Sequence, residues 1–456
     1  MRTVFVVVSK DIVRRNVLET DFWPKFMAQK GGARVVLFVE RGKGTYYREK
    51  FSSDNVVVEE FSNQTHRSWS RFLFFLIRTG IRSRSTTVHR WRLYKRGDIN
   101  LPVTLFRSFI SFFFARFAWY KHMLRWLIVH ARQPTFVEGC FEKYRPDLVF
   151  LTSPLDFAFN DIVSIEARRR GVRIISMMRS WDNLNHHGLL PVVPDRFVFQ
   201  NIWLKKAAER FQAIDTNSLQ TDIVGIPHYD SYKNPQSYLE PREAFFKRMG
   251  LDPSKKLIFA GGAEYYYSED VLPKLLDDLI GSGAIRTPAQ AVFRPHPSSM
   301  FSSADYKFSE LRHVVPNVGA PGESPKAFSD TTTFINLLYH AGVTINIAST
   351  LSIDAAAFDK PVIAIGFDDP AKRLSYWESV ERFNDHFDHQ EHLLGTGGAR
   401  IANSRDELAR LINLYLDDPS LDKEGRKKIL AEFVEPFDGH AGERLACILS
   451  EEVAKV

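Results

Sequence analysis

Cysteine is scarce in this sequence, which has only Cys140 and Cys447 among its 456 residues. Two thiols this far apart supply neither a disulfide framework nor the paired spacing of a zinc site. The composition therefore excludes a disulfide-stapled secreted scaffold and favours a reducing, cytoplasmic compartment.

Long apolar runs are also missing. The closest candidate, residues 109–114, is bounded by Arg107 and Arg116, so no stretch approaches the roughly 18 uninterrupted apolar residues of a membrane span. The first apolar run, 4–8, is too short for a signal peptide and is followed at once by Lys10. We expect a protein without a membrane-spanning helix.

A glycine-rich dinucleotide fingerprint does not follow the first predicted strand, so that class of cofactor site is excluded. What the chain does contain is a repeated alternation of short β-branched runs with longer amphipathic segments, which predicts parallel sheets with crossover helices. The predicted strands are 3–9, 33–39, 56–60, 147–152, 172–178, 196–199, 221–224, 256–259, 289–293, 343–347 and 362–365.

The length predicts two domains, at about 150 residues each with room for an insertion. The segment 234–238 (Asn-Pro-Gln-Ser-Tyr) has the composition of a linker. We therefore predict an α/β protein with Rossmann-like domains at 1–232 and 239–456. The last helix of the second domain is expected to pack back on the first.

Acidic residues are nearly absent from 64–134, where fourteen Arg or Lys residues accompany one acid, Asp98. That segment carries +13, so with a total of +7 the rest of the chain sums to −6. Aromatic residues are interleaved with the cations, and we predict a helical insertion over about 62–135. Contact with an anionic membrane surface is the favoured interpretation; nucleic-acid binding and a solvated face over an aromatic core are the alternatives.

The stretch 343–366 is predicted to be strand, tight turn, helix and strand, with Ser349 and Thr350 where the first strand gives way to the helix and Asp354 within the helix. In a βαβ unit this turn lies at the carboxyl edge of the sheet, where free N–H groups and the helix dipole favour an anion. Both hydroxyls could bind phosphate oxygens. The plain alternative is helix capping by Ser349 or Thr350.

A second element follows the run 289–293: Arg294 and His296 lie in the sequence Arg-Pro-His-Pro. The two prolines hold the histidine in an extended turn, and an arginine can meet phosphate with a bidentate fork. Two such motifs on strand ends predict the two sides of a pocket for a nucleoside mono- or diphosphate. A third strand end contributes three candidates of weaker standing, namely Gly261, Gly262 and Glu264.

These motifs resemble the bacterial surface-polymer transferases, a group that includes CDP-glycerol glycerophosphotransferase-like proteins and the capsular Kdo and polysialic acid transferases. The resemblance covers most of the chain, although not the 62–135 insertion. The matching residues are Arg-Pro-His-Pro at 294–297, Ser349-Thr350 with Asp354, Ser-Trp-Asp-Asn-Leu at 180–184, and Asp438-Gly439-x-Ala441-Gly442-Glu443-Arg444. It implies a GT-B architecture, two Rossmann-like domains facing a central cleft, in which an HP motif and an S-S/T motif grip the donor phosphate.

The resemblance also implies a catalytic base at Asp182, where the glycerophosphotransferases have a histidine instead. Transfer to a hydroxyl needs a base for its proton and groups that stabilise the leaving phosphate, and His296 is the expected partner on the phosphate. Three further residues are acceptor-side candidates, two of them alternative bases: Asp11, Asp156 and Asn183. Asp182 could instead only cap the turn that follows it, through Asn183.

No metal or other cofactor is expected beyond a nucleotide-activated sugar as co-substrate. His186 and His187 are adjacent on one loop, and the sequence shows no cysteine or carboxylate spacing that would complete a site around them.

The leading functional hypothesis is an inverting glycosyltransferase of bacterial capsule or lipopolysaccharide assembly, peripheral on the inner face of the cytoplasmic membrane. It would use a nucleotide-sugar donor and a glycan or glycolipid acceptor. The alternatives are a polyol-phosphate transferase of the CDP-glycerol type, a UDP-sugar 2-epimerase, and a non-catalytic membrane-associated scaffold of polysaccharide assembly. No nucleic-acid motif accompanies the basic segment, so nucleic acid is not an expected partner.

Overall fold

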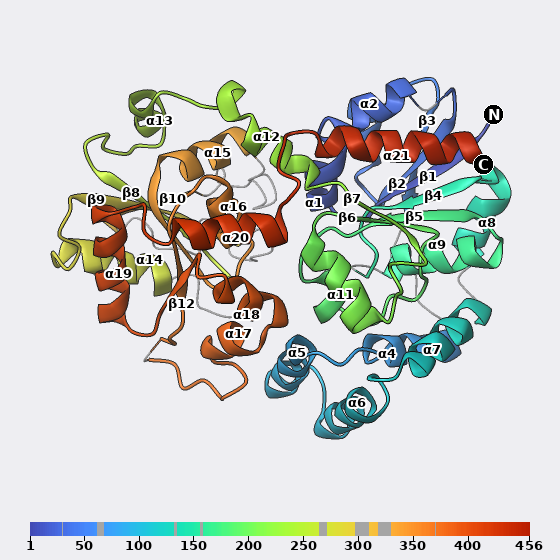
Figure 1. The fold of residues 1–456 in the computed structure, drawn as a ribbon, viewed down its shortest axis with the longest axis horizontal. Coiled ribbons are helices and arrows are strands. Elements are labelled where there is room, and N and C mark those ends of the chain that lie inside the picture. The colour runs from blue at the N-terminus through green and yellow to red at the C-terminus, as the bar shows by residue number, and fades with distance from the viewer. Residues whose placement is uncertain are drawn as a thin grey trace. The chain divides into compact units, whose positions relative to one another are not determined.

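The computed structural model describes residues 1–29, 31–61, 68–131, 135–155, 158–263, 271–296, 310–317, 330–369 and 371–456. The chain forms two compact units, drawn in Figure 1. The first comprises Met1–Ser231 together with Glu432–Val456, and the second comprises Tyr232–Ala431. The C-terminal segment that the sequence placed at the end of the second domain is therefore part of the first unit.

The first unit is built on a seven-stranded parallel sheet in the order β3-β2-β1-β4-β5-β6-β7. This order changes direction between β1 and β4, which is the switch point of a doubly wound sheet, where ligands bind beyond the carboxyl ends of the strands. The strands are β1 (Thr3–Val8), β2 (Arg34–Glu40), β3 (Val56–Phe61), β4 (Leu148–Leu151), β5 (Arg173–Met177), β6 (Arg196–Phe199) and β7 (Gln220–Ile223).

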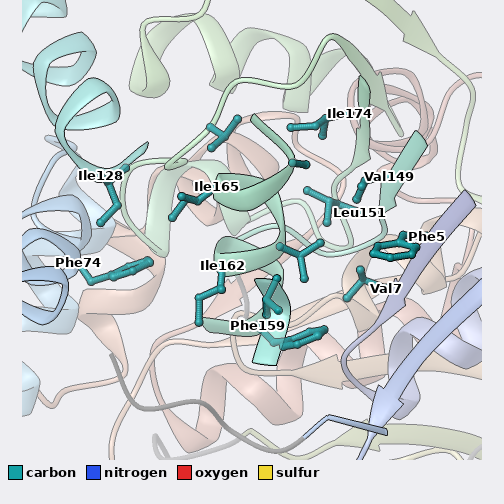
Figure 2. Packing of buried hydrophobic residues seen from close by; sticks show 14 of the residues in the cluster. Phe5, Val7, Phe74, Ile128, Val149, Leu151, Phe159, Ile162, Ile165 and Ile174 are labelled. Atoms are coloured by element: carbon teal, nitrogen blue, oxygen red, sulfur yellow. The ribbon is translucent and has the colours of Figure 1, made fainter. Parts of the chain in front are cut away.

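Both faces of this sheet are covered, as its apolar strands require. Alternate residues of β1 enter two separate cores: Phe5 and Val7 lie in one, and Val4 and Val6 lie in the other. Figure 2 shows the first core, where α9 (Ala158–Arg169) lies on the sheet and presents Phe159 toward the strand side chains. Other helical segments of the first unit include α1 (Asp11–Val13), the π-helix η1 (Arg14–Leu18), α2 (Phe22–Gln29), α3 (Gly44–Phe51), α8 (Thr135–Tyr144), α10 (Asn183–His186) and α11 (Ile202–Gln212).

The C-terminal helix α21 (Ala441–Lys455) packs on α2. Asp230 accepts hydrogen bonds from the backbone N–H groups of Ala441 and Gly442 at 3.0 and 2.8 Å, so it caps the start of the helix. Arg444 binds Asp438 at 2.7 Å and the carbonyl oxygen of Val224 at 2.7 Å. The 438–444 motif therefore holds the chain end on the first unit.

The insertion between β3 and β4 is helical, as predicted, and its helices are α4 (Ser68–Arg78), α5 (Arg84–Lys95), α6 (Leu101–Phe113) and α7 (Ala118–His130). Phe74 of α4 and Ile128 of α7 pack in the same core as α9 (Figure 2). Two buried cations fix α7 on the last turn of α11, because Lys121 Nζ and Arg125 Nη2 each donate to a carbonyl oxygen there at 2.7 Å. A helix C-terminus favours such cations.

The second unit contains a six-stranded parallel sheet in the order β10-β9-β8-β11-β12-β13. Its strands are β8 (Lys256–Gly261), β9 (Ala289–Arg294), β10 (Val314–Pro316), β11 (Ala341–Asn346), β12 (Val362–Ile365) and β13 (Arg400–Ala402). Its helical segments include η3 (Pro235–Ser237), α13 (Arg242–Arg248), α14 (Val271–Gly281), α15 (Thr331–His340), α16 (Leu351–Ala357), α17 (Glu381–His386), α18 (Asp388–Gly395) and α19 (Arg405–Asp417). Two more helices, α12 (Asp230–Lys233) and α20 (Lys423–Phe433), belong to it in part, because the chain passes from one unit to the other within each of them.

Three sequence-based expectations need correction. No strand was predicted between 293 and 343, where the structure has β10, a three-residue edge strand next to β9. The strand β13 was not predicted, and neither was the short helix α3. Each of these elements is too short to show a periodic pattern.

The buried carboxylate of Glu452 is expected to stabilise the attachment of α21. It is fully buried and binds Arg196 at 3.0 Å and also Arg173. Replacing one member of a buried ion pair leaves the other charges uncompensated. Glu452→Gln should lower the free energy of unfolding by about 2–4 kcal/mol in urea titrations. Glu451→Gln, a neighbour with a more exposed side chain and a longer contact to Arg196, should cost less than about 1 kcal/mol.

The stability advantage of the wild type over Glu452→Gln should depend on pH. Burial raises the pKa of Glu452, but its bonds to Lys455 and Arg173 outweigh burial and leave the pKa lowered. A lowered pKa means that the folded form releases this proton more readily, so the wild-type advantage should shrink as the pH falls through the carboxyl range. Equal urea stabilities of the two variants at neutral pH would contradict this account.

Candidate functional site

The carboxyl ends of β1 and β4 are tied together at the switch point of the first sheet. Thr152 donates to the carbonyl oxygen of Val7 at 2.5 Å. The amide of Asn160, on α9, donates to Ser9 Oγ at 2.8 Å and to the carbonyl oxygen of Ser153 at 2.9 Å. These buried polar contacts hold the strand ends in place. Asn160 could not be singled out from the sequence, because it lies inside a helix and its partners are distant in the chain.

Asp11 follows β1 and is held in an ion pair. Its carboxylate lies 3.0 Å from Lys43 Nζ, which also contacts Glu40 at 2.8 Å. The pKa of Lys43 is lowered by burial but raised more by these two carboxylates, and the net shift is upward. The Asp11 carboxylate is thus already engaged by a lysine, whereas the partners of Asp182 are two histidines. Asp156 lies outside the described residues.

Asp182 and Asn183 follow β5 and have different surroundings. Asn183 is buried, and its Oδ1 accepts a hydrogen bond from the backbone N–H of Ser180 at 2.8 Å. Asn183 therefore supports the turn. Asp182 precedes the short helix α10 but makes no capping bond with its side chain. The side chain that supports this turn is therefore that of Asn183 and not that of Asp182. The Asp182 carboxylate lies beside two histidines instead.

The Asp182 carboxylate forms a compact cluster with His186 and His187. One carboxylate oxygen lies 3.7 Å from His186 Nδ1 and 3.7 Å from His187 Nε2, and the three side chains are 13–33% exposed. Burial lowers the pKa of His186, partly opposed by the nearby carboxylate, which favours a neutral imidazole. A ligand from solution can reach this cluster.

The same three residues could hold a divalent metal, because their ligand atoms all lie within 4.8 Å of one another. Two imidazoles and one carboxylate form a ligand set common to several transition metals. The sequence argument that no carboxylate completes a set around the histidines is therefore wrong, since Asp182 does so one helical turn away. The absence of a metal requirement stays a prediction.

A single buried glutamine supports the loop that carries this cluster. Gln212, at the end of α11, donates to the carbonyl oxygens of Leu184 and Gly188 at 2.7 and 2.9 Å. Its Oε1 accepts from the N–H of Leu190 at 2.8 Å. Trp181 is anchored as well, because its carbonyl oxygen accepts from Trp203 Nε1 at 2.8 Å. Sequence reasoning missed Gln212 because its partners are distant backbone atoms.

In the second unit, β9, β8 and β11 are consecutive strands, so their carboxyl ends lie side by side. Gly261 at the end of β8 pairs with Arg294 at the end of β9, and the N–H of Gly262 donates to the carbonyl oxygen of Arg294 at 2.8 Å. A Cβ at Gly261 would lie 2.7 Å from Leu351 Cδ2, so the glycine allows the start of α16 to approach. Glu264 lies outside the described residues.

The turn between β11 and α16 is shaped by Asn346, which is fully buried. Its amide donates to Ser352 Oγ at 3.0 Å, and its Oδ1 lies 3.3 Å from the N–H of Ser349. Ala348 has a φ of 40°, a left-handed conformation that is costly for alanine. The structure therefore fixes this turn in an uncommon shape, as functional turns often are. Asn346 was not identified from the sequence.

Ser349, Thr350 and Asp354 play different parts in this turn. Ser349 Oγ accepts a long hydrogen bond of 3.3 Å from the N–H of Leu351, so it has a partial capping role. Thr350 is exposed and makes no capping bond with its side chain. Asp354 is buried inside the helix. The hydroxyl of Thr350 is thus the one at this edge most open to a ligand.

Arg294 is the last residue of β9, and His296 follows it, at the same edge of the sheet but one strand beyond β8. Arg294 is mostly buried, and its guanidinium lies 4.5 Å from the ring centre of Phe334 on α15, a cation–π contact. His296 is partly exposed. The structure therefore brings the Arg-Pro-His segment and the Ser349 turn to one edge of one sheet. An edge with a cation, an imidazole and hydroxyls can bind a phosphate group.

Comparison with known proteins supports the fold. No family model matches the chain, and no curated protein matches it. Among solved structures, it is similar to Staphylococcus aureus MnaA in a co-structure with UDP, at 12% identity and a TM-score of 0.55, with 100% of this chain and 98% of that chain covered. It is also similar to a Neisseria meningitidis UDP-GlcNAc 2-epimerase bound to UDP-GlcNAc, at 10% identity and a TM-score of 0.54, with coverages of 99% and 100%.

A glycosyltransferase from Rickettsia africae is similar as well, at 12% identity and a TM-score of 0.51, with coverages of 100% and 99%. At these identities the likeness concerns the fold. The two parallel-sheet α/β units and their structural neighbours confirm the predicted GT-B fold with two Rossmann-like domains. The finer resemblance to surface-polymer transferases stays a prediction.

Gln212 should be essential to the stability of the Asp182 loop. Gln212→Leu removes three hydrogen bonds and leaves buried backbone groups without partners, so the free energy of unfolding should fall by about 2–4 kcal/mol. Urea titration measures this, with Gln220→Leu as the control because Gln220 is exposed and makes one side-chain contact, to Arg173 at 3.2 Å. A loss below about 1 kcal/mol for Gln212→Leu would show that the loop is held by other contacts.

Proposed function

We propose that this protein is an inverting glycosyltransferase that takes its sugar from a nucleotide-activated donor. The observation that carries the proposal is that the Arg294–His296 segment and the Ser349–Thr350 turn lie at the same edge of the second unit's sheet, at the ends of β9 and β11, which are separated only by β8. Structural neighbours named as UDP-GlcNAc 2-epimerases and as a glycosyltransferase support a nucleotide-sugar ligand. The region beyond the carboxyl ends of the strands is where this fold class binds ligands.

In this proposal the second unit binds the nucleotide phosphates. The hydroxyls of Ser349 and Thr350 donate hydrogen bonds to the phosphate oxygens, and His296 donates another. Arg294 supplies a positive charge from its buried position beside Phe334. These groups stabilise the negative charge that develops on the leaving phosphate as its bond to the sugar breaks.

Asp182 of the first unit serves as the base. An acceptor hydroxyl oxygen attacks the anomeric carbon while its proton passes to the Asp182 carboxylate, and the glycosidic bond to the nucleotide phosphate breaks on the opposite face. The configuration is therefore inverted. His186 and His187, 3.7 Å from the carboxylate, orient it and can receive hydrogen bonds from the acceptor or the protonated carboxyl group.

The acceptor in this proposal is a glycan or glycolipid of capsule or lipopolysaccharide assembly, met at the inner face of the cytoplasmic membrane. Two features support this: the family resemblance and the cationic aromatic insertion of the first unit. Among the residues that the structure describes, no helix is long and apolar enough to cross a membrane, so any attachment by these residues would be peripheral.

A UDP-sugar 2-epimerase is the second candidate, because several of the similar solved structures carry that name. It would bind the same nucleotide but need no acceptor. Incubating the protein with UDP-GlcNAc alone and analysing the sugar by NMR distinguishes the two, since only an epimerase would form the 2-epimer. A polyol-phosphate transferase would instead prefer CDP donors, and a scaffold would bind no nucleotide.

The nucleotide site predicts a selective thermal shift. One member of a panel of CMP, CDP, UMP, UDP, GDP and ADP, at ~100 times its dissociation constant, should stabilise the wild type by about 2.7 kcal/mol. His296→Ala should lose most of this shift. The control is His313→Ala, because His313 precedes β10 and so lies at the opposite, amino edge of the same sheet. If no nucleotide shifts the wild type, the transferase proposal fails.

If Asp182 is the base, replacing it should slow sugar transfer without weakening nucleotide binding. Asp182→Asn should lower the rate of labelled-sugar transfer to membrane glycolipid by about 10²–10⁴-fold, while the nucleotide-induced thermal shift stays within experimental error of the wild type. Asp11→Asn should reduce the rate by less than tenfold, because Asp11 is already paired with Lys43. A full rate in Asp182→Asn, or a larger loss in Asp11→Asn, would move the base to another residue.

A further inference from the structure

Exposed hydrophobic side chains are concentrated in one part of the first unit. Among the described residues, sixteen large hydrophobic side chains are exposed, and all but four of them lie in 69–126. Monomeric proteins seldom leave so many apolar groups together in water. The twelve residues, here called the aromatic face, are Trp69, Phe72, Leu101, Leu105, Phe106, Phe109, Phe112, Phe113, Phe117, Trp119, Met123 and Trp126.

In the helix α6, which belongs to this face, the buried residues are polar and the exposed residues are mainly apolar. Its two buried residues are polar: Thr104 donates to the carbonyl oxygen of Asn100 at 2.9 Å, and Ser111 donates to that of Ile81 at 2.9 Å. Its exposed residues are mainly leucine and phenylalanine. A helix on the surface of a water-soluble domain normally shows the reverse pattern. The orientation of α6 is therefore explained by an apolar medium on its outer side.

The helix α7 is apolar on two sides. Tyr120, Leu124 and Ile128 lie in the protein core, and Lys121 and Arg125 fix the helix to the end of α11. On its other side three residues at helical spacing are exposed, namely Trp119, Met123 and Trp126. Because the inner side is firmly packed, the exposure of the outer side does not come from a poorly docked helix.

Exposed cations lie in the same segment as the aromatic face, and two of them stack on its rings. Arg82 lies 4.5 Å from the ring centre of Phe112, and Arg116 lies 4.6 Å from that of Phe117. Of the twelve Arg and Lys residues of 64–134 that the structure describes, four are buried inside the protein, whereas six are exposed. The exposed ones are Arg71, Arg82, Arg84, Lys95, Arg96 and Arg116.

We propose that the aromatic face inserts into the headgroup–acyl boundary of an anionic lipid bilayer. A second copy of this chain is a poor occupant because it would bring the same positive charges to the contact, whereas anionic headgroups neutralise them. The 13 residues of α6 span only about 20 Å, less than the roughly 30 Å of a hydrocarbon core. The helix therefore lies in the plane of the interface, with its rings below the headgroups.

This inference does not require the transferase chemistry, and the two fail separately. Vesicle binding is measured without a nucleotide, and the nucleotide-induced thermal shift is measured without lipid. If both hold, the acceptor is delivered at the bilayer surface. A lipid-linked acceptor is then the chemical class that suits the enzyme.

The test is sedimentation of the full chain with vesicles of phosphatidylcholine alone or with 30% phosphatidylglycerol. The wild type should partition at least tenfold more strongly to the anionic vesicles, and 0.5 M salt should weaken this binding. The triple variant Phe109→Ser, Phe112→Ser, Phe113→Ser should lose at least tenfold in partitioning. The control is Tyr46→Ser, Tyr339→Ser, Tyr376→Ser, which removes three exposed rings elsewhere and should bind like the wild type.

A second measurement reports insertion itself. Brominated acyl chains should quench the fluorescence of the wild type, and the triple variant Trp69→Phe, Trp119→Phe, Trp126→Phe, which removes the three exposed tryptophans of the aromatic face, should remove most of this quenching. Circular dichroism and thermal melting check that the variants fold.

The inference is overturned if the variant Phe109→Ser, Phe112→Ser, Phe113→Ser binds anionic vesicles like the wild type, since binding would then be purely electrostatic. It is also overturned if the face mediates self-association or retention on DNA without vesicle binding.

Discussion

The parallel pairing of the strands decides where the candidate site residues of both sheets lie. Because every strand in each sheet runs the same way, each sheet delivers all its carboxyl ends to one edge, and side chains that are distant in sequence meet there. Arg294 and Ser349 are 55 residues apart in the chain but follow strands that are separated only by β8. The same geometry places the Asp182 loop next to the polar contacts around Asn160 at the ends of β1 and β4.

The strands were predictable because buried parallel strands are short apolar runs that the sequence displays directly. The residues at their ends were therefore predictable too, including Asp182 and Ser349. Residues that support these ends were not. Gln212 and Asn346 act through hydrogen bonds to backbone atoms that only the folded chain brings near, and nothing in their local sequence distinguishes them. The three-residue strands β10 and β13 were missed because they are too short to show a period.

The basic residues of the insertion have two different roles, one structural and one at the surface, which a count of charges does not distinguish. Lys121 and Arg125 are internal, and burial lowers the pKa of Lys121 to about 8 and that of Arg125 to about 10. They bind the carbonyl groups at the end of α11, and they hold α7 in place so that its outer side stays apolar and exposed. Of the exposed cations, Arg82 and Arg116 stack on the outward rings of Phe112 and Phe117. The sequence showed the interleaving of cations and aromatics, but only the structure separates the structural cations from those that face outward.

The central claim is that the carboxyl edge of the second sheet binds a nucleotide. Hydrogen exchange measured with and without UDP, CMP and CDP tests this most directly, because it reports where a ligand protects the backbone. The account predicts that one of these nucleotides slows exchange in 346–354 and 291–296, while 312–316 is unchanged. Protection confined to other segments, or no protection by any nucleotide, would contradict the claim.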